Sequence, residues 1–143
     1  MKLLGVDYGR RRIGLSISDE SGIAVRPLHL IDRNKDPSPH ETIARLVNSE
    51  MAEGIVFGLP LDIDDRETEM SREVKAFSET VREKLPPKFL LDFTDESFSS
   101  VHAHEQMLGF KKKKARSKKG AADLYAACSI LRSYFEEHGE LTR

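Results

Sequence analysis

The chain has no tryptophan, only one cysteine and no long apolar segment. The single cysteine, Cys128, cannot form an internal disulfide, and this favours a reducing compartment such as the cytoplasm. No segment approaches the roughly 18 apolar residues of a membrane-spanning helix, which excludes an integral membrane protein. Lys2 places a charge where the apolar core of a signal peptide would begin. We therefore expect a soluble, cytoplasmic protein.

Length and composition point to one folded domain. The chain has 143 residues, of which 38% are hydrophobic and 33% are charged. This length suffices for one hydrophobic core and is too short for two well-packed domains. We expect a single domain over residues 1–143.

The net charge of −1 hides an uneven distribution. Seven of the 23 basic residues lie in residues 111–119, which leaves 16 basic residues against 24 acidic residues elsewhere. A second basic cluster, Arg10–Arg12, lies near the start. Two basic patches on an acidic body suggest an anionic ligand that binds at a defined place. A solvated lysine-rich loop explains the longer run equally well.

Hydrophobic periodicity predicts a mixed α/β fold. Apolar or alternating segments predict strands over residues 3–8, 13–18, 25–31, 54–57 and 88–93. Helical spacing predicts helices over residues 38–51, 70–85, 101–108 and 120–135, the first with Ser38 as its N-cap, Pro39 as its first residue and Glu41 three residues after the cap. Three strands in succession form an antiparallel meander, and the later alternation of helices and strands implies a mixed sheet with helices on both faces.

Three acidic residues are the main candidates for chemistry. Asp7 ends an apolar strand and Glu96 follows another, so both could lie at the carboxyl edge of the sheet. Asp123 lies at the border of an apolar, alanine-rich helix face. Each also has a structural explanation, because Asp7 suits a turn and the other two suit the first turn of a helix.

Carboxylates of this kind could hold one or two Mg²⁺ or Mn²⁺ ions, which prefer oxygen ligands. Such ions can activate a water molecule and stabilise the leaving oxygen of a phosphodiester. A zinc site is not indicated, because His102 and His104 are two residues apart and do not share a helix face.

Four short segments occur in an order that is specific as a set. They are Gly5-Val6-Asp7-Tyr8-Gly9-Arg10-Arg11-Arg12-Ile13-Gly14-Leu15-Ser16, Ile55-Val56-Phe57-Gly58-Leu59-Pro60-Leu61, Asp95-Glu96-Ser97 and Asp123-Leu124-Tyr125-Ala126-Ala127. Together they resemble the YqgF-type family of Holliday-junction-resolvase-like proteins, which are also described as pre-16S rRNA nucleases. The match covers essentially the whole chain.

The resemblance implies an RNase H-like fold with a five-stranded mixed sheet. It also implies a hydrolase, a divalent-metal-dependent endonuclease, in which Asp7, Glu96 and Asp123 are the catalytic residues and hold Mg²⁺ or Mn²⁺. The nucleic-acid partner would then be bound by the two basic clusters, with candidate residues Arg10, Arg11, Lys111, Lys112, Lys113, Lys114, Arg116, Lys118 and Lys119.

The chain departs from the family pattern in three places. Tyr8 stands where the family usually has proline, Asp64-Asp65 where it usually has a glycine, and Ser97 where it usually has arginine. Serine cannot replace the bidentate phosphate contact of a guanidinium. The last departure therefore bears on catalytic strength more than on fold.

The sequence is compatible with several functions. Processing of the 5′ end of pre-16S rRNA in ribosome biogenesis ranks first, and resolution of four-way DNA junctions in recombination and repair is the alternative within the same class. A catalytically weak nucleic-acid-binding module in RNA metabolism is a third possibility, which the change at Ser97 favours. An ATP-using kinase or actin-like protein would need two domains, and 143 residues do not provide them.

Overall fold

The strands and helices follow the predicted order along the chain. The computed structural model describes residues 1–62, 64, 66–95 and 120–142. The strands are β1 (Leu3–Asp7), β2 (Arg12–Ser18), β3 (Val25–Asp32), β4 (Gly54–Leu59) and β5 (Leu90–Asp95), and the helices are α1 (Pro39–Ser49), α2 (Glu69–Arg82) and α4 (Ala121–Thr142). The helix expected over residues 101–108 lies outside the described residues.

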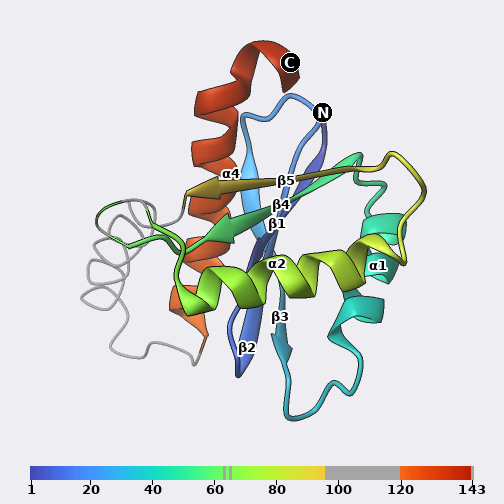
Figure 1. The fold of residues 1–143 in the computed structure, drawn as a ribbon. Coiled ribbons are helices and arrows are strands. Elements are labelled where there is room, and N and C mark those ends of the chain that lie inside the picture. Colours follow the sequence, from blue (N-terminus) through green and yellow to red (C-terminus); the bar gives the residue numbers. More distant parts are fainter. Residues whose placement is uncertain (63, 65, 96–119, 143) are drawn as a thin grey trace, which may run out of the picture.

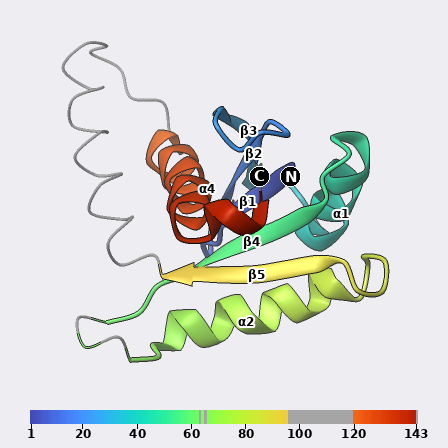
Figure 2. The same cartoon turned by 90° about the horizontal axis from the view of Figure 1, so that it is seen from above.

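The five strands form one mixed sheet in the order β3-β2-β1-β4-β5. The first three strands pair antiparallel, as the meander predicts, whereas β4 runs parallel to both β1 and β5. Helix α4 covers one face of the sheet, and α1 and α2 cover the other (Figures 1 and 2). The predicted mixed sheet with helices on both faces is confirmed.

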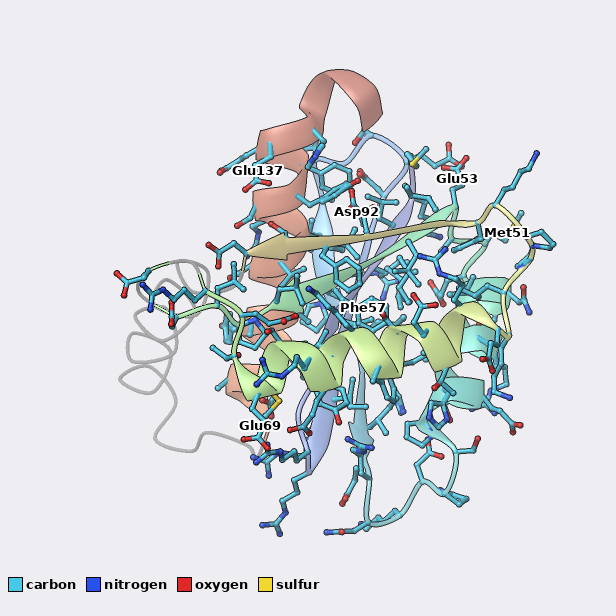
Figure 3. The ribbon with its side chains drawn as sticks, in the orientation of Figure 1. Met51, Glu53, Phe57, Glu69, Asp92 and Glu137 are labelled. Carbon is cyan, nitrogen blue, oxygen red and sulfur yellow. The ribbon has the colours of Figure 1, made fainter. Side chains whose placement is uncertain are left out.

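Each face of the sheet has its own hydrophobic cluster, because side chains alternate between faces along a strand. Leu4, Val6 and Phe57 pack with α1 and α2, and Figure 3 shows Phe57 between the sheet and α2. On the other face Leu3 and Val56 pack with the apolar side of α4. Within the described part of the chain, no helix is long and apolar enough to span a membrane.

The start of α1 differs from the sequence prediction. Pro39 begins the helix as expected, but the Ser38 side chain makes no capping hydrogen bond. The Asp36 carboxylate makes the hydrogen bonds at the start of the helix instead. It accepts from the Ser38 amide at 2.9 Å and from the Thr42 hydroxyl at 2.6 Å. The hydrogen bond from Thr42 lowers the pKa of Asp36, which keeps this carboxylate ionised.

Helix α2 has a reciprocal cap that the sequence pattern did not reveal. The Thr68 side chain accepts from the Ser71 amide at 3.0 Å, and the Ser71 hydroxyl accepts from the Thr68 amide at 2.8 Å. A capping box is usually recognised by glutamate or glutamine at the third helical position. Ser71 occupies that position here, so the usual sequence pattern of a capping box is absent.

Candidate active site

Asp7 lies at the carboxyl end of β1, on the face of the sheet that α4 covers. Residues 3, 5 and 7 share this face because strand side chains alternate. Leu3 belongs to the cluster beneath α4, and a Cβ on Gly5 would lie 2.9 Å from the Ala127 carbonyl oxygen of that helix. Asp7 is half-buried. The half-buried carboxylate therefore belongs to the edge of the sheet next to the first turns of α4.

Asp123 reaches the same edge through a close contact between helix and sheet. A Cβ on Gly14 would lie 2.7 Å from the Asp123 carbonyl carbon, so the helix backbone occupies the space that a side chain would need. Gly14 pairs directly with Asp7 across the antiparallel ladder. Opposite residues in such a ladder have Cα atoms about 4.5–5.5 Å apart. Asp7 and Asp123, which are far apart in the sequence, are thus brought together.

Small residues on β1 and β2 make this close approach possible. Gly5, Gly14 and Ser16 all lie beneath α4, and the Ser16 hydroxyl donates to the Ala127 carbonyl at 2.7 Å. This contact holds the second turn of α4 on the sheet. These contacts with the sheet fix the start of the helix, which carries Asp123 in its first turn.

Arg12 contacts Asp123 directly. Its Nε atom lies 3.2 Å from Asp123 Oδ2, and the two side chains are 33% and 30% exposed. Arg12 begins β2 and shares a face with Gly14 by the same alternation. The site therefore contains two carboxylates and one guanidinium among the described residues.

The loop that follows β1 is held against α2. Arg10 forms a two-nitrogen ion pair with Glu73, with Nε 3.0 Å from Oε2. The hydrogen bond with Glu73 raises the pKa of Arg10, and the same bond lowers the pKa of Glu73. Arg33 donates to the Gly9 carbonyl at 3.0 Å and lies over the Tyr8 ring at 5.1 Å. Tyr8, which stands where the family usually has proline, joins the loop to α2, because its ring centroid lies 5.0 Å from that of Phe77.

The carboxyl end of β5 lies at the same edge of the sheet. Val6, Phe57 and Phe93 form one rung across β1, β4 and β5, so Asp7 and Thr94 each follow one residue later. Thr94 is buried, and its hydroxyl has no hydrogen-bond partner within the described part of the chain. β5 ends at Asp95, and Glu96 is the next residue in the sequence.

Several predicted residues cannot be placed. Glu96 and the basic run at residues 111–119 lie outside the described residues, as does Ser97. Arg10 and Arg11 are both exposed, and Arg10 is already paired with Glu73. The convergence of all three carboxylates on one cation therefore stays a prediction.

The donors present suit a hard divalent cation. Among the described residues, no group of three or more His, Cys, Asp or Glu side chains is placed to hold a metal. Asp7 and Asp123 nevertheless offer carboxylate oxygens at one half-buried edge, and Mg²⁺ is commonly bound through one or two carboxylates with waters retained. The two described residues fit part of such a site, and Glu96 would have to complete it.

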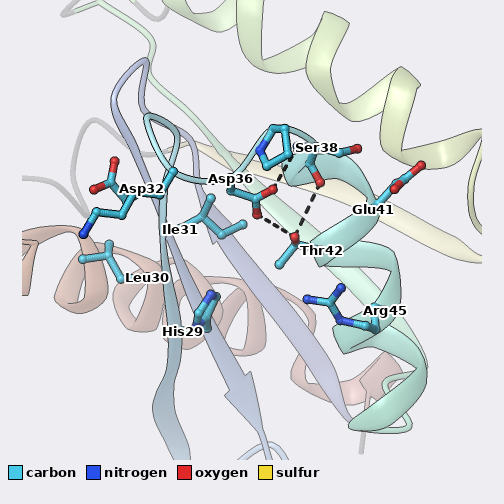
Figure 4. A pocket seen from close by; sticks show the side chains of 11 residues that line it. His29, Leu30, Ile31, Asp32, Asp36, Ser38, Glu41, Thr42 and Arg45 are labelled. Carbon is cyan, nitrogen blue, oxygen red and sulfur yellow. Dashed lines mark hydrogen bonds between the residues drawn. The ribbon is translucent and has the colours of Figure 1, made fainter.

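A separate pocket lies between β3 and the start of α1 (Figure 4). Its lining includes Ile31, which belongs to the hydrophobic cluster on the α1 and α2 face. This pocket therefore opens on the opposite face of the sheet from Asp7 and Asp123. Asp36 in its wall is engaged in the α1 cap.

Arg12 and Gly14 are the site residues that sequence reasoning missed. The sequence shows Arg10–Arg12 as one basic cluster and does not separate its members. Alternation along β2 could have revealed them. Arg12, Gly14 and Ser16 lie two positions apart and therefore share one face of the strand, and two of the three are small residues.

Comparison with known proteins identifies a family and sequence relatives of this chain. The model of the RuvX family, described as Holliday junction resolvase, matches residues 1–137. A protein of a Sulfurihydrogenibium species named "Putative pre-16S rRNA nuclease" is 35% identical over 135 residues, which cover 94% of this chain and 90% of that protein. A protein of Phocaeicola vulgatus with the same name is 34% identical over 142 residues, which cover 94% of this chain and 95% of that protein.

Solved structures share the fold at low sequence identity. Thermus thermophilus RuvC in complex with a Holliday junction substrate has a TM-score of 0.60 at 15% identity, and the match covers 97% of this chain and 96% of RuvC. The fowlpox virus Holliday junction resolvase has a TM-score of 0.57 at 12% identity, with 96% and 99% covered. The predicted RNase H-like fold is confirmed by these likenesses. The family match over residues 1–137 shows that this chain belongs to the RuvX family, described as Holliday junction resolvase.

Proposed function

We propose that this protein is a metal-dependent endonuclease that hydrolyses phosphodiester bonds in structured nucleic acid. The observation that carries the proposal is the contact of Asp123 with Gly14, the residue paired with Asp7. It brings two carboxylates from opposite ends of the chain to one edge of the sheet. Membership of a nuclease family supports the same reaction.

Asp7, Asp123 and Glu96 are the residues that would hold the cation. When bound, Mg²⁺ or Mn²⁺ would activate the attacking water and stabilise the leaving oxygen. The protein's own contribution is to fix the carboxylates before substrate arrives. Gly14 sets the position of the α4 backbone, and Arg12 orients the Asp123 carboxylate through its Oδ2 atom.

The substrate that we propose is the 5′ end of pre-16S rRNA in the cytoplasm. Its support is the name of the relatives that are 34–35% identical over nearly the whole chain. A four-way DNA junction is the second candidate, because the family description and the titles of fold neighbours name Holliday junctions. Both substrates offer the phosphodiester backbone that the site would act on.

The basic clusters would bind the nucleic-acid backbone outside the cation site. Arg11 is exposed and directly precedes Arg12 in the chain, and Arg10 would have to exchange its contact with Glu73 for a phosphate. The lysines and the arginine at residues 111–119 would supply further sequence-independent affinity.

A cleavage assay tests the proposal. A pre-16S rRNA fragment, a four-way DNA junction and a matched single strand would be incubated with Mg²⁺, with Mn²⁺ and with chelator. We expect cleavage of the RNA only with a cation, and a loss of about 100-fold or more for Asp7→Asn and Asp123→Asn. Glu20→Gln, an exposed carboxylate in the β2–β3 connection, is the matched control and should cleave like the wild type. Cleavage of the junction alone would favour resolution of DNA, and no cleavage of any substrate would overturn the proposal.

A further inference from the structure

Arg12 has unused hydrogen-bond donors beside the candidate cation site. Its contact with Asp123 uses the Nε atom, at 3.2 Å from Oδ2. Within the described part of the chain, its Nη1 and Nη2 atoms make no hydrogen bond. The side chain is 33% exposed, so it remains in contact with solvent. A guanidinium has five N–H donors in a planar fork, and most of those of Arg12 remain available.

Arg10 and Arg12 differ in how many guanidinium nitrogens their ion pairs use. Arg10 directs both Nε and Nη2 to the Glu73 carboxylate, so its fork is occupied. Arg12 contacts its partner through the single nitrogen nearest the side-chain stem. Its two terminal nitrogens are the pair that matches two oxygens of a phosphate.

We propose that Arg12 is a phosphate-binding residue of this site. Its Nε atom holds Asp123 while Nη1 and Nη2 donate to the non-bridging oxygens of the phosphate next to the cation. This inference rests on the proposed function, since it assigns the group that receives the substrate phosphate.

The charge of Arg12 and the restraint on its side chain both support this role. Asp7 and Asp123 alone would repel a phosphate, and Arg12 places a positive charge in contact with Asp123. The ion pair also restricts the Arg12 side chain before substrate arrives. A restrained arginine loses less conformational entropy on binding a phosphate than a free one, which favours tight and oriented binding.

Nucleic-acid binding in the presence of chelator tests the proposal without relying on turnover. We expect Arg12→Gln to weaken binding about 10-fold, the value of a lost hydrogen bond to a charged group. The slope of log affinity against log salt should fall by about 0.9 on duplex. Arg26→Gln is the control, because it removes an arginine of β3 that is also ion-paired, with Glu50 at 3.3 Å. It should change neither affinity nor slope.

Arg12→Lys separates a phosphate contact from a merely structural ion pair. Lysine keeps the charge and can still pair with Asp123, but it lacks the fork. We expect it to retain the salt slope and to lower the single-turnover cleavage rate at saturating RNA. If Arg12 only supports Asp123, Arg12→Gln will bind RNA like Arg26→Gln, and this result would overturn the inference. If the wild type fails to cleave while Arg12→Gln still loses affinity, the proposed nuclease function fails and the phosphate contact stands.

Discussion

Gly14 and Asp123 touch where a helix crosses the sheet, and a Cβ on Gly14 would lie 2.7 Å from the Asp123 carbonyl carbon. The contact connects β2 with α4, and the ladder connects Gly14 with Asp7. A residue without a side chain therefore determines the relative position of two candidate catalytic carboxylates.

Gly14→Ala should destabilise the protein by about 1–3 kcal/mol, the usual cost of forcing extra volume into a packed site. Because the added methyl group would push the first turn of α4 outward, RNA cleavage should fall as well. Urea unfolding measures the first effect. The control is Gly139→Ala, since a Cβ there would meet nothing within 4 Å. Equal unfolding midpoints for the two variants would contradict this account of the helix position.

The same contact explains where the sequence prediction of β2 was incomplete. Alternation of apolar and small residues over residues 13–18 is typical of a half-buried strand. The structure buries every residue from Ile13 to Ser18. Small residues on the second face are there because α4 packs on them, and Ser16 is hydrogen-bonded to that helix. The residues of one strand alone cannot distinguish a face open to water from a face that receives a helix backbone.

Other features were predictable from local sequence. The apolar runs placed all five strands, and the change from hairpins to alternating helices and strands predicted the mixed sheet. The alanine-rich side of the last helix pointed to Asp123 as the border of a sheet-facing surface, and Ala127 of that side does contact β1. The Arg12–Asp123 pair joins residues 111 positions apart, and no local pattern reveals such a contact.

Tyr134 should make stability depend on pH at the alkaline end. Its phenol donates to the Asp92 carboxylate at 2.9 Å, and burial followed by this hydrogen bond raises the pKa of Tyr134 to about 12. The usual value is about 10, so the folded state favours the neutral phenol and its contribution is complete below about pH 10. The contribution is lost as pH rises from about 10 to about 12. The difference in unfolding free energy between wild type and Tyr134→Phe should shrink between about pH 10 and pH 12, and a constant difference would be evidence against this assignment.

Removal of divalent cations should leave the fold intact. Both hydrophobic clusters consist of side chains from the sheet and its covering helices, and neither depends on the edge that carries Asp7. Chelator should therefore abolish RNA cleavage while the thermal midpoint moves by no more than about 3 °C, equivalent to roughly 1 kcal/mol. Differential scanning calorimetry with and without chelator makes the comparison. A much larger drop would show that the cation is structural.

The lysine run should contribute affinity without sequence preference. Replacing Lys111, Lys112, Lys113 and Lys114 with alanine should weaken binding to RNA and DNA alike. Each lysine that contacts a phosphate contributes about 0.9 to the salt slope on duplex and about 0.7 on single strands. Turnover at saturating substrate should change little, since these residues are not proposed to hold the cation. Unchanged affinity and unchanged slope would mean that the run is a solvated loop.

The most direct test of the account is whether Asp7 and Asp123 hold the same divalent cation. Mn²⁺ titration of the wild type, Asp7→Asn, Asp123→Asn and the double variant measures the affinity and the number of ions bound. Glu20→Gln is the control and should bind like the wild type. If the residues share one ion, either single change should remove that ion or weaken it at least about 10-fold, and the double variant should lose no further ion. Single variants that each keep a wild-type site for Mn²⁺ would contradict the shared site.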